Sequence, residues 1–217
     1  AGFPCTDLSQ AGRMAGIDGT NSSLVRYLFD ALRNAGPMGS RPTLVIENVP
    51  NMLALDKGRA MRYLVQELEE LGYAWAYRVV DSRFTGVPQR RRRVILVASN
   101  DVDPRAVLFS DNVGARPDAD LADDVFGFYW TEGRGGLGWA RDALPTIKGG
   151  STIGIPSPPA MWVPGAQQGR KFVKPSIEDA EAMQGFDRGW TDVPGLGDRA
   201  AGARWKQLAS IQVSSGP

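Results

Sequence analysis

Two stretches of the chain, residues 22–36 and 57–72, carry an apolar residue at every third or fourth position. This spacing places the apolar side chains on one face of a helix. Each stretch also ends at a glycine, Gly36 or Gly72, and glycine is favoured just past the end of a helix. The pattern therefore predicts two amphipathic helices that each bury one face.

Three shorter stretches favour strands. Residues 43–46 form a continuous run of mostly apolar and β-branched residues, which is typical of a strand buried on both faces. Residues 73–81 and 92–99 also have strand character, and turn-forming residues join them. The order helix, strand, helix, strand, strand indicates an α/β fold, and we expect its sheet to be mainly parallel.

The periodic pattern stops in residues 104–172, which are rich in glycine, proline and aromatic residues. We expect this region to form a small inserted domain built from turns and short strands. We interpret the FGFYW cluster at 126–130 and Trp139 first as the core of that domain. A base-stacking role for these rings is the alternative.

One more helix is predicted over residues 176–184. Ser176 follows a proline and can cap the helix, and Asp179 stands three residues later. This spacing is a weaker form of the capping box, in which two side chains satisfy the free backbone donors at the start of a helix.

The composition excludes several kinds of chemistry. The chain has 217 residues with one cysteine, no histidine and a net charge of +1. An internal disulfide, a zinc site of several cysteines and histidine-based acid–base catalysis are therefore excluded. With so small a net charge, any attraction to nucleic acid must be local. The sequence shows no signal peptide and no long apolar run, so we expect a cytoplasmic protein.

The single cysteine, Cys5, follows Pro4 and precedes a glycine-rich segment. A lone cysteine is most often a small buried thiol. Beside a proline turn and a flexible loop, however, the sulfur stands where a nucleophile can be presented, and thiols are intrinsically very nucleophilic.

A second candidate feature is Glu47, which follows directly after the apolar run of residues 43–46 and is itself followed by Asn48 and Val49. The carboxyl end of a buried strand is where α/β folds place their ligand sites. An ordinary solvated loop acid is the alternative.

The third feature is the basic run of residues 89–93, which leads into the strand predicted at 92–99. In an extended strand alternate residues share a face, so Gln89, Arg91 and Arg93 would point the same way. Planar donors of this kind suit contact with phosphate or a nucleobase. A solvated basic edge is the alternative.

Taken together and in this order, these motifs resemble those of the DNA (cytosine-5) methyltransferase family of bacteria and phages. GFPCTDLSQAG is similar to its Pro-Cys motif, VIENVPNM to its Glu-Asn-Val motif and GVPQRRRRVILVAS to its Gln-x-Arg-x-Arg motif. LPTIKGGSTIGIPSPP resembles the end of a target-recognition region, and KPSIEDAEAMQGF resembles the helix that follows it. The resemblance covers nearly the whole chain.

The resemblance implies a catalytic role for three residues. Cys5 would attack carbon 6 of cytosine as a thiolate, Glu47 would hold ring nitrogen 3, and Arg93 would contact the oxygen at carbon 2. Because the target atom is unreachable inside a duplex, the base would have to flip out.

The resemblance also implies supporting residues and DNA contacts. The supporting residues would be Pro4, Asn48, Val49, Gln89 and Arg91. The DNA contacts would come from a mobile loop at 9–20 and from the target-recognition region, namely Ser9, Arg13, Arg134 and Lys148.

By resemblance, the fold is an incomplete Rossmann-like methyltransferase sheet with an inserted, β-rich target-recognition domain. Residues 1–103 would be the C-terminal half of the catalytic domain and 104–172 the target-recognition region. Residues 173–217 would be a truncated return segment that packs on the catalytic domain.

The methyl donor implied by the resemblance is S-adenosylmethionine, and the substrate is double-stranded DNA in a restriction-modification setting. No Phe-x-Gly-x-Gly loop precedes Cys5, so the main cofactor-binding motifs are missing from this sequence. We therefore expect the isolated chain to be weak or inactive, and we expect the cofactor-binding half to lie on a separate chain or in a longer gene.

Two other functions remain open from the sequence. The chain could bind DNA without chemistry, as a remnant of such an enzyme. It could also methylate cytosine in RNA such as tRNA, although the long insert at 104–172 favours DNA.

Overall fold

The computed structural model of the chain describes residues 25–36, 41–110, 122–129, 139–147, 159–167, 171–195 and 197–210. The chain divides into two compact units. Unit 1 comprises Ala1–Val80 and Arg92–Gly114, and unit 2 comprises Asp81–Arg91 and Ala115–Pro217. The boundaries of these two units differ from the expected domain boundaries. The expected division into domains stays a prediction.

Unit 1 contains the two amphipathic helices that the sequence predicts, α1 (Val25–Asn34) and α2 (Arg59–Glu70). Gly36 and Gly72, just past their ends, have φ angles of 99° and 78°. This left-handed conformation suits glycine, which has no Cβ to clash. Among the described residues, no helix is long and apolar enough to cross a membrane.

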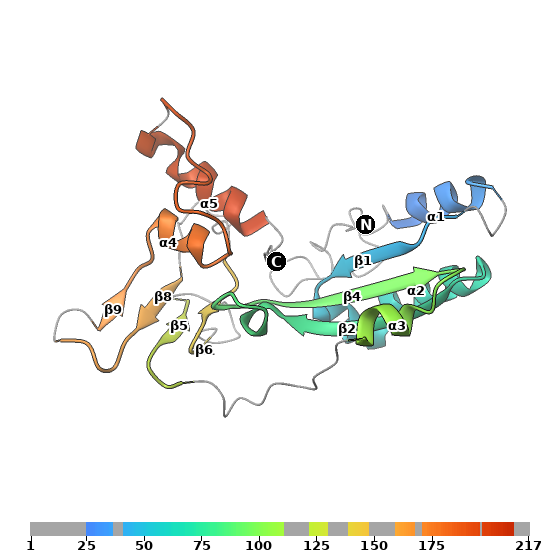
Figure 1. Cartoon of the computed structure of the whole chain (residues 1–217), viewed down its shortest axis with the longest axis horizontal. Coiled ribbons are helices and arrows are strands. Elements are labelled where there is room, and N and C mark those ends of the chain that lie inside the picture. The colour runs from blue at the N-terminus through green and yellow to red at the C-terminus, as the bar shows by residue number, and fades with distance from the viewer. Residues whose placement is uncertain are drawn as a thin grey trace. The chain divides into compact units, whose positions relative to one another are not determined.

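The sheet of unit 1 has the strand order β1-β4-β2, formed by β1 (Leu44–Asn48), β2 (Ala74–Asp81) and β4 (Arg92–Ser99) (Figure 1). The expected mainly parallel arrangement is wrong for this sheet, because β1 and β4 pair antiparallel. A parallel connection needs a long crossover, usually a helix. Such a helix, α2, links β1 to β2, whereas the connection from β2 to β4 contains only the short 3-10 helix Ser82–Phe84.

The strand β1 also differs from the expectation that it is buried on both faces. Leu44 and Ile46 are buried, whereas Val45 between them is 52% exposed. The strand therefore buries alternate residues, as expected of a sheet with one covered face.

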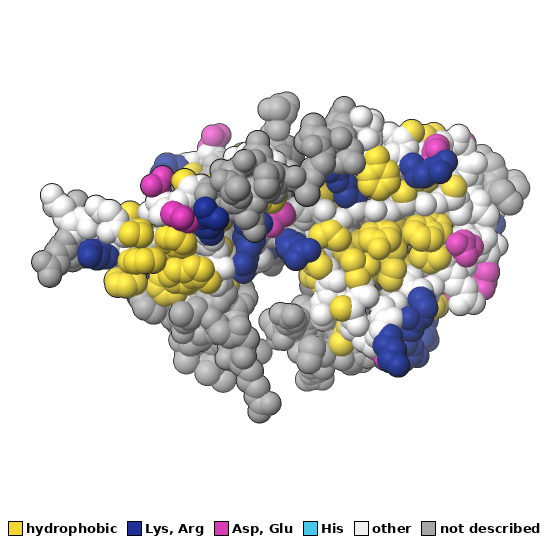
Figure 2. Space-filling model, turned by 90° about the horizontal axis from the view of Figure 1, so that it is seen from below, with side chains coloured by type: hydrophobic (Ala, Val, Ile, Leu, Met, Phe, Trp, Pro, Cys, Tyr) yellow, Lys and Arg dark blue, Asp and Glu magenta, His cyan; other side chains and the backbone are white. Residues whose placement is uncertain are grey.

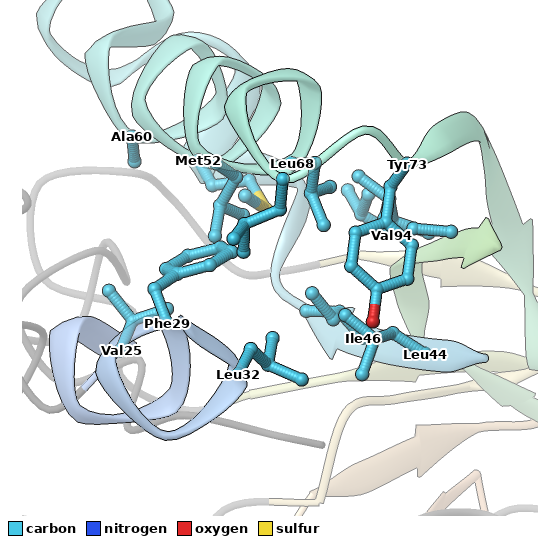
Figure 3. Close-up of a cluster of buried hydrophobic side chains, with 14 residues drawn as sticks. Val25, Phe29, Leu32, Leu44, Ile46, Met52, Ala60, Leu68, Tyr73 and Val94 are labelled. Atoms are coloured by element: carbon cyan, nitrogen blue, oxygen red, sulfur yellow. The ribbon is translucent and has the colours of Figure 1, made fainter. Parts of the chain in front are cut away.

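A single core of 14 buried residues joins α1, α2 and the sheet of unit 1 (Figure 3). Phe29 on α1 meets the Tyr63 ring on α2 edge to face, with ring centroids 6.0 Å apart. Each large apolar side chain buried in this way stabilises the fold by about 1.5–3 kcal/mol. The core thus fixes β1 and β4 against two helices.

The region expected to be irregular from residue 104 begins instead with a short helix in unit 1, α3 (Pro104–Phe109). Pro104 stands in its first turn, where the missing N–H of proline does no harm. The Asp103 side chain caps the helix by accepting a hydrogen bond from the backbone N–H of Arg105 at 2.9 Å. The proline and the cap are enough to start a helix here, although the apolar residues no longer recur at helical spacing.

Unit 2 contains short strands, as expected for the insert. An antiparallel sheet of order β6-β5-β8-β9 is formed by β5 (Phe126–Phe128), β6 (Ala140–Arg141), β8 (Ala160–Trp162) and β9 (Phe172–Val173). A separate parallel pair joins β3 (Gln89–Arg90) to β7 (Leu144–Pro145).

In the described part of unit 2 the chain forms the helices α4 (Ile177–Ala182) and α5 (Ala201–Ser210), the latter preceded by a 3-10 turn at Gly197–Ala200. The predicted capping box is confirmed: Ser176 accepts a hydrogen bond from the Asp179 N–H at 3.1 Å, and Asp179 accepts one from the Ser176 N–H at 3.0 Å.

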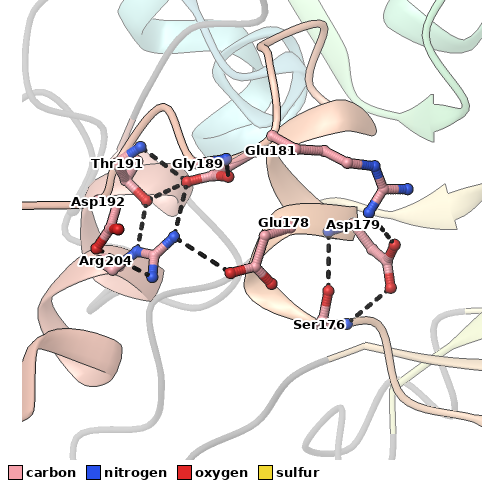
Figure 4. A network of polar contacts seen from close by, with 9 residues as sticks. Ser176, Glu178, Asp179, Glu181, Gly189, Thr191, Asp192 and Arg204 are labelled. Carbon is pink, nitrogen blue, oxygen red and sulfur yellow. Dashed lines mark hydrogen bonds and ion pairs between the residues drawn. The ribbon is translucent and has the colours of Figure 1, made fainter. Parts of the chain in front are cut away.

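A fully buried carboxylate, Glu181, holds α4, the loop after it and α5 together (Figure 4). The Gly189 N–H donates to it at 2.5 Å, and Thr191 donates with both its backbone N–H and its hydroxyl. Arg204 on α5 donates to the same carboxylate at 3.2 Å and to the Thr191 hydroxyl at 2.9 Å. Burial by itself raises the pKa of Glu181, but these hydrogen bonds outweigh it, and the pKa lies below its ordinary value.

We expect Glu181→Gln to lower the free energy of unfolding by about 3 kcal/mol, because Arg204 then lacks its buried counter-charge. Because the pKa of Glu181 is lowered by folding, the ionised carboxylate stabilises the fold above its ordinary pKa of 4.5. This contribution is lost as the pH falls further toward the lowered value. Urea unfolding between pH 7 and pH 3 measures both effects (roughly the range over which a carboxyl titrates).

The matched control is Glu178→Gln. Its carboxylate lies 3.6 Å from the same Arg204 but is 46% exposed, so its loss should change stability by less than about 0.5 kcal/mol. Equal losses for both variants would show that burial of Glu181 is not what stabilises this junction.

Candidate active site

Two of the residues expected at the active site meet in unit 1. Glu47 lies near the end of β1 and Arg93 near the start of β4. The antiparallel register pairs Asn48 with Val94, which brings these two strand ends together. The Arg93 Nε lies 2.6 Å from Glu47 Oε1, and the side chains are 19% and 18% exposed.

This ion pair is partly shielded from water, so the attraction between its charges is stronger than in a fully exposed pair. Arg93 also donates from Nη1 to the carbonyl oxygen of Arg92 at 2.8 Å. The guanidinium is therefore held at two points, and it fixes one oxygen of the Glu47 carboxylate.

The strand β1 ends at Asn48, one residue after Glu47. The buried side chain of Asn48 accepts a hydrogen bond from the Val49 N–H at 2.8 Å. Val49 is extended, and Pro50 opens a short 3-10 helix, Pro50–Leu53, closed by a bond from the Met52 N–H to the Val49 carbonyl at 3.1 Å. The expectation that Asn48 and Val49 support the Glu47 loop therefore has a local structural basis.

A strained turn follows in the same connection. Asp56, Lys57 and Gly58 are consecutive residues in the left-handed region, with φ of 50°, 53° and 75°. For residues other than glycine this conformation costs on the order of 1–2 kcal/mol each. A Cβ at Gly58 would lie 2.9 Å from the Leu53 carbonyl oxygen. Sequence reasoning missed this turn, since no proline or Asn-Gly pair marks it.

The basic run of residues 89–93 does not form one strand, which corrects the expectation that Gln89, Arg91 and Arg93 share a face. Gln89 belongs to β3 in unit 2 and is fully buried, and β4 in unit 1 begins only at Arg92. Arg91, between the two strands, is also buried. The alternative that the basic run is a solvated edge is therefore wrong for Gln89 and Arg91.

Asp81 and Ser82 explain the break, and sequence reasoning missed them. The Asp81 carboxylate accepts a hydrogen bond from the Arg91 N–H at 3.2 Å, and the Ser82 N–H donates to the Arg91 carbonyl at 3.1 Å. The Ser82 hydroxyl also donates to the Gln89 carbonyl at 2.6 Å. These contacts satisfy the backbone of Arg91 outside any sheet ladder.

The other expected site residues lie outside the described residues. They are Pro4, Cys5, Ser9, Arg13, Arg134 and Lys148. The approach of Cys5 to the Glu47–Arg93 pair therefore stays a prediction.

One cavity in the described part of unit 1 lies away from this pair. This cavity of about 660 Å³ is lined by residues 99–105 and by Glu69, Tyr73, Ala74 and Trp75. It lies at the Ser99 end of β4, whereas Arg93 stands at the other end, about 20 Å along the strand. A methyl donor in this cavity would be too far from a base held by Glu47.

An α/β unit with a carboxylate and a guanidinium paired at the ends of two adjacent strands is an arrangement suited to binding a polar ring. Residues 1–114 match the family model of the C-5 cytosine-specific DNA methylases. The chain belongs to this family.

The chain is similar to known methyltransferases over its whole length. It is 48% identical to the type II methyltransferase M2.BsuMI of Bacillus subtilis (strain 168), over 99% of this chain and 57% of that protein. It is 36% identical to M.BanI of Aneurinibacillus aneurinilyticus, over 53% of this chain and 26% of that protein. The chain thus spans little more than half of M2.BsuMI.

Two solved structures share the fold. The Dnmt2 methyltransferase of S. pombe matches with a TM-score of 0.61 and 13% identity, over 99% of this chain and 74% of that one. EhMeth of Entamoeba histolytica matches with a TM-score of 0.60 and 14% identity, over 98% and 72%. At this identity the likeness concerns the fold alone.

We expect Arg93→Gln to lower the free energy of unfolding by about 1–2 kcal/mol, because the shielded Glu47 carboxylate then has no counter-charge. Arg92→Gln is the matched control, since Arg92 is the exposed neighbour in the same strand, and it should change stability by less than about 0.5 kcal/mol. Urea unfolding compares the two. A loss no larger for Arg93→Gln than for the control would contradict a structural role for the ion pair.

Proposed function

We propose that this chain carries the base-activating part of an enzyme that transfers a methyl group from S-adenosylmethionine to carbon 5 of cytosine in double-stranded DNA. The observation that carries the proposal is the Glu47–Arg93 ion pair at 2.6 Å, in a chain of the C-5 cytosine-specific DNA methylase family. The family supplies the reaction, and the pair supplies two groups that match the polar edge of cytosine.

Carbon 5 of cytosine is a poor nucleophile, and the proposed enzyme overcomes this by a covalent step. The Cys5 thiolate adds to carbon 6, which forms a carbon–sulfur bond and moves an electron pair of the ring double bond toward carbon 5. Negative charge develops in the ring, and a proton taken up from solvent at ring nitrogen 3 neutralises it. Glu47 favours this protonated form by accepting a hydrogen bond from the N–H of ring nitrogen 3. Such a group is most effective when it is placed before the reaction begins.

Arg93 is proposed to contact the oxygen at carbon 2 of the same ring. Guanidinium carries five N–H donors, and the contacts to Glu47 and to the Arg92 carbonyl use its Nε and Nη1 groups. Donors therefore remain for the base. Through its bond to Glu47, Arg93 would also keep the carboxylate directed at ring nitrogen 3 when no base is bound.

The remaining expected residues have supporting roles in this proposal. Pro4 would orient the cysteine, Asn48 and Val49 would fix the Glu47 turn, and Gln89 and Arg91 would support the basic strand ends. Because the base must leave the duplex, phosphate contacts would be needed around it. The proposed contacts come from Ser9, Arg13, Arg134 and Lys148.

A covalent trapping assay tests the proposal. DNA in which 5-fluorocytosine replaces cytosine makes knowledge of the recognition sequence unnecessary, because the fluorine blocks release of the enzyme after methylation. The chain is incubated with this DNA and S-adenosylmethionine, alone and with a cofactor-binding segment of M2.BsuMI added. We expect an adduct on a denaturing gel in at least one preparation, and mass spectrometry should place it on Cys5.

The controls decide between chemistry and binding. Cys5→Ser should abolish the adduct, and Glu47→Gln should slow it by about 100-fold, the lower part of the range typical of positioned acid–base groups. The proposal is wrong if Cys5→Ser forms the adduct equally well, or if neither preparation forms one while the chain still binds the DNA. Adducts on 5-fluorocytosine RNA but not on DNA would favour an RNA substrate.

A further inference from the structure

The four-stranded sheet of unit 2 has one face covered with aromatic rings, and the strand register defines that face. Phe126 is paired across the sheet with Trp162, which is in turn paired with Phe172. Directly paired residues lie on the same face of a sheet, and Phe128 shares it because it stands two residues after Phe126. Trp139, which just precedes β6, joins them through its ring contacts.

Ring contacts link the five side chains into one cluster. The Trp139 ring is stacked on Phe126 at a centroid distance of 5.3 Å, and Trp162 lies 5.2 Å from Phe126 and 5.8 Å from Trp139. Phe128 contacts both Trp139, at 5.6 Å, and Phe172, at 6.2 Å. We call these five residues the aromatic face.

The aromatic face is partly open to solvent, whereas the sequence favoured a buried core for the FGFYW cluster and Trp139. Phe128 is buried, but Trp139 is 41% exposed and Phe172 is 61% exposed. The opposite side of the sheet is the packed one, since a Cβ at Gly127 would lie only 2.2 Å from the Ala143 carbonyl oxygen. Glycine at this position lets the sheet bury one side and display the rings on the other.

Cationic side chains stand at both edges of the aromatic face. Arg141 on β6 is paired with Phe126 in the register, but its guanidinium forms an ion pair with Asp123. Lys171 and Lys174 flank β9 on the opposite edge and are the cations that remain for phosphate. The two lysines are exposed, and neither makes an ion pair within the described part of the chain. Figure 2 shows hydrophobic side chains gathered on this unit with Lys or Arg side chains beside them.

We propose that the aromatic face binds single-stranded nucleic acid by stacking unpaired bases on Trp139 and Phe172. An antiparallel sheet with exposed aromatic rings and flanking cations offers two complementary contacts, rings for the bases and cations for the phosphates. A duplex cannot use the rings, because its base faces are covered by neighbouring bases. A purely apolar partner would gain nothing from the lysines at the edge.

The backbone of Trp139 is also held in place for this role. Arg90 on β3 donates from Nη1 to the Trp139 carbonyl oxygen at 2.6 Å. The Trp139 ring itself packs against Phe126, Phe128 and Trp162. It therefore loses little freedom on contact with a base, which favours affinity. The ligand class is an unpaired strand of either DNA or RNA, since both present the same base faces and phosphates.

Fluorescence anisotropy with labelled single strands tests the inference on the whole 217-residue chain. The probes are a thymidine and a uridine oligonucleotide of about 15 nucleotides and a mixed-sequence duplex of the same length. We expect Trp139→Ala and Phe172→Ala each to weaken binding of the favoured single strand by about 5- to 100-fold. Lys174→Gln should reduce the slope of log affinity against log salt by about 0.7.

Trp190→Ala is the matched control, because Trp190 is 61% exposed, as is Phe172, but lies outside the aromatic face and is stacked on Phe186. It should bind as the unchanged chain does. Phe172→Leu keeps an apolar side chain without a ring and should lose nearly as much affinity as Phe172→Ala. Circular dichroism of each variant verifies folding, and tighter binding of the uridine or the thymidine strand identifies the natural ligand as RNA or DNA.

Several outcomes would overturn the inference. These are unchanged single-strand affinity in Trp139→Ala and Phe172→Ala, full affinity in Phe172→Leu, or duplex binding that depends on the rings to the same degree. Self-association of the chain that Phe172→Ala abolishes would instead assign the face to a second copy. The inference goes beyond the proposed methyl transfer and can fail separately, since Cys5→Ser should leave single-strand binding intact.

Discussion

The site of this protein depends on one ion pair, between Glu47 at the end of β1 and Arg93 at the start of β4. The pair exists because the two strands run antiparallel, so that the end of one meets the beginning of the other. The apolar core of unit 1 fixes the position of both strands, and the Asn48 side chain accepts a hydrogen bond from the Val49 N–H where β1 ends. The packing of the apolar core therefore determines where the charged groups of Glu47 and Arg93 lie.

Unit 2 is organised around a different polar group. The buried Glu181 carboxylate gathers the loop after α4 and the start of α5 through donors from Gly189, Thr191 and Arg204. Unit 2 also contains the four-stranded sheet. Gly127 allows close packing on one side of this sheet, and Trp139 and Phe172 are exposed to solvent on the other. In both units, buried residues therefore fix the positions of a small number of exposed or half-exposed side chains.

Local signals in the sequence predicted much of this structure. The spacing of apolar residues predicted α1 and α2, the run at 92–99 predicted β4 with its observed bounds, and Ser176 with Asp179 predicted the capping box. The pairing of strands is decided by residues far apart in the chain, so neither the antiparallel sheet nor the break at Arg91 could be predicted. The exposure of Phe172 also depends on which side of the sheet is packed, and a pattern of rings does not reveal that.

The most direct test of this account is a double-mutant cycle on the rate of Cys5 adduct formation with 5-fluorocytosine DNA. Glu47→Gln, Arg93→Gln and the double variant are compared with the unchanged chain. If the two side chains act as one unit on the base, the double variant should be no slower than the slower single variant, since contacting residues couple by about 0.5–3 kcal/mol. Losses that simply multiply would show that Glu47 and Arg93 act independently, and would contradict the account.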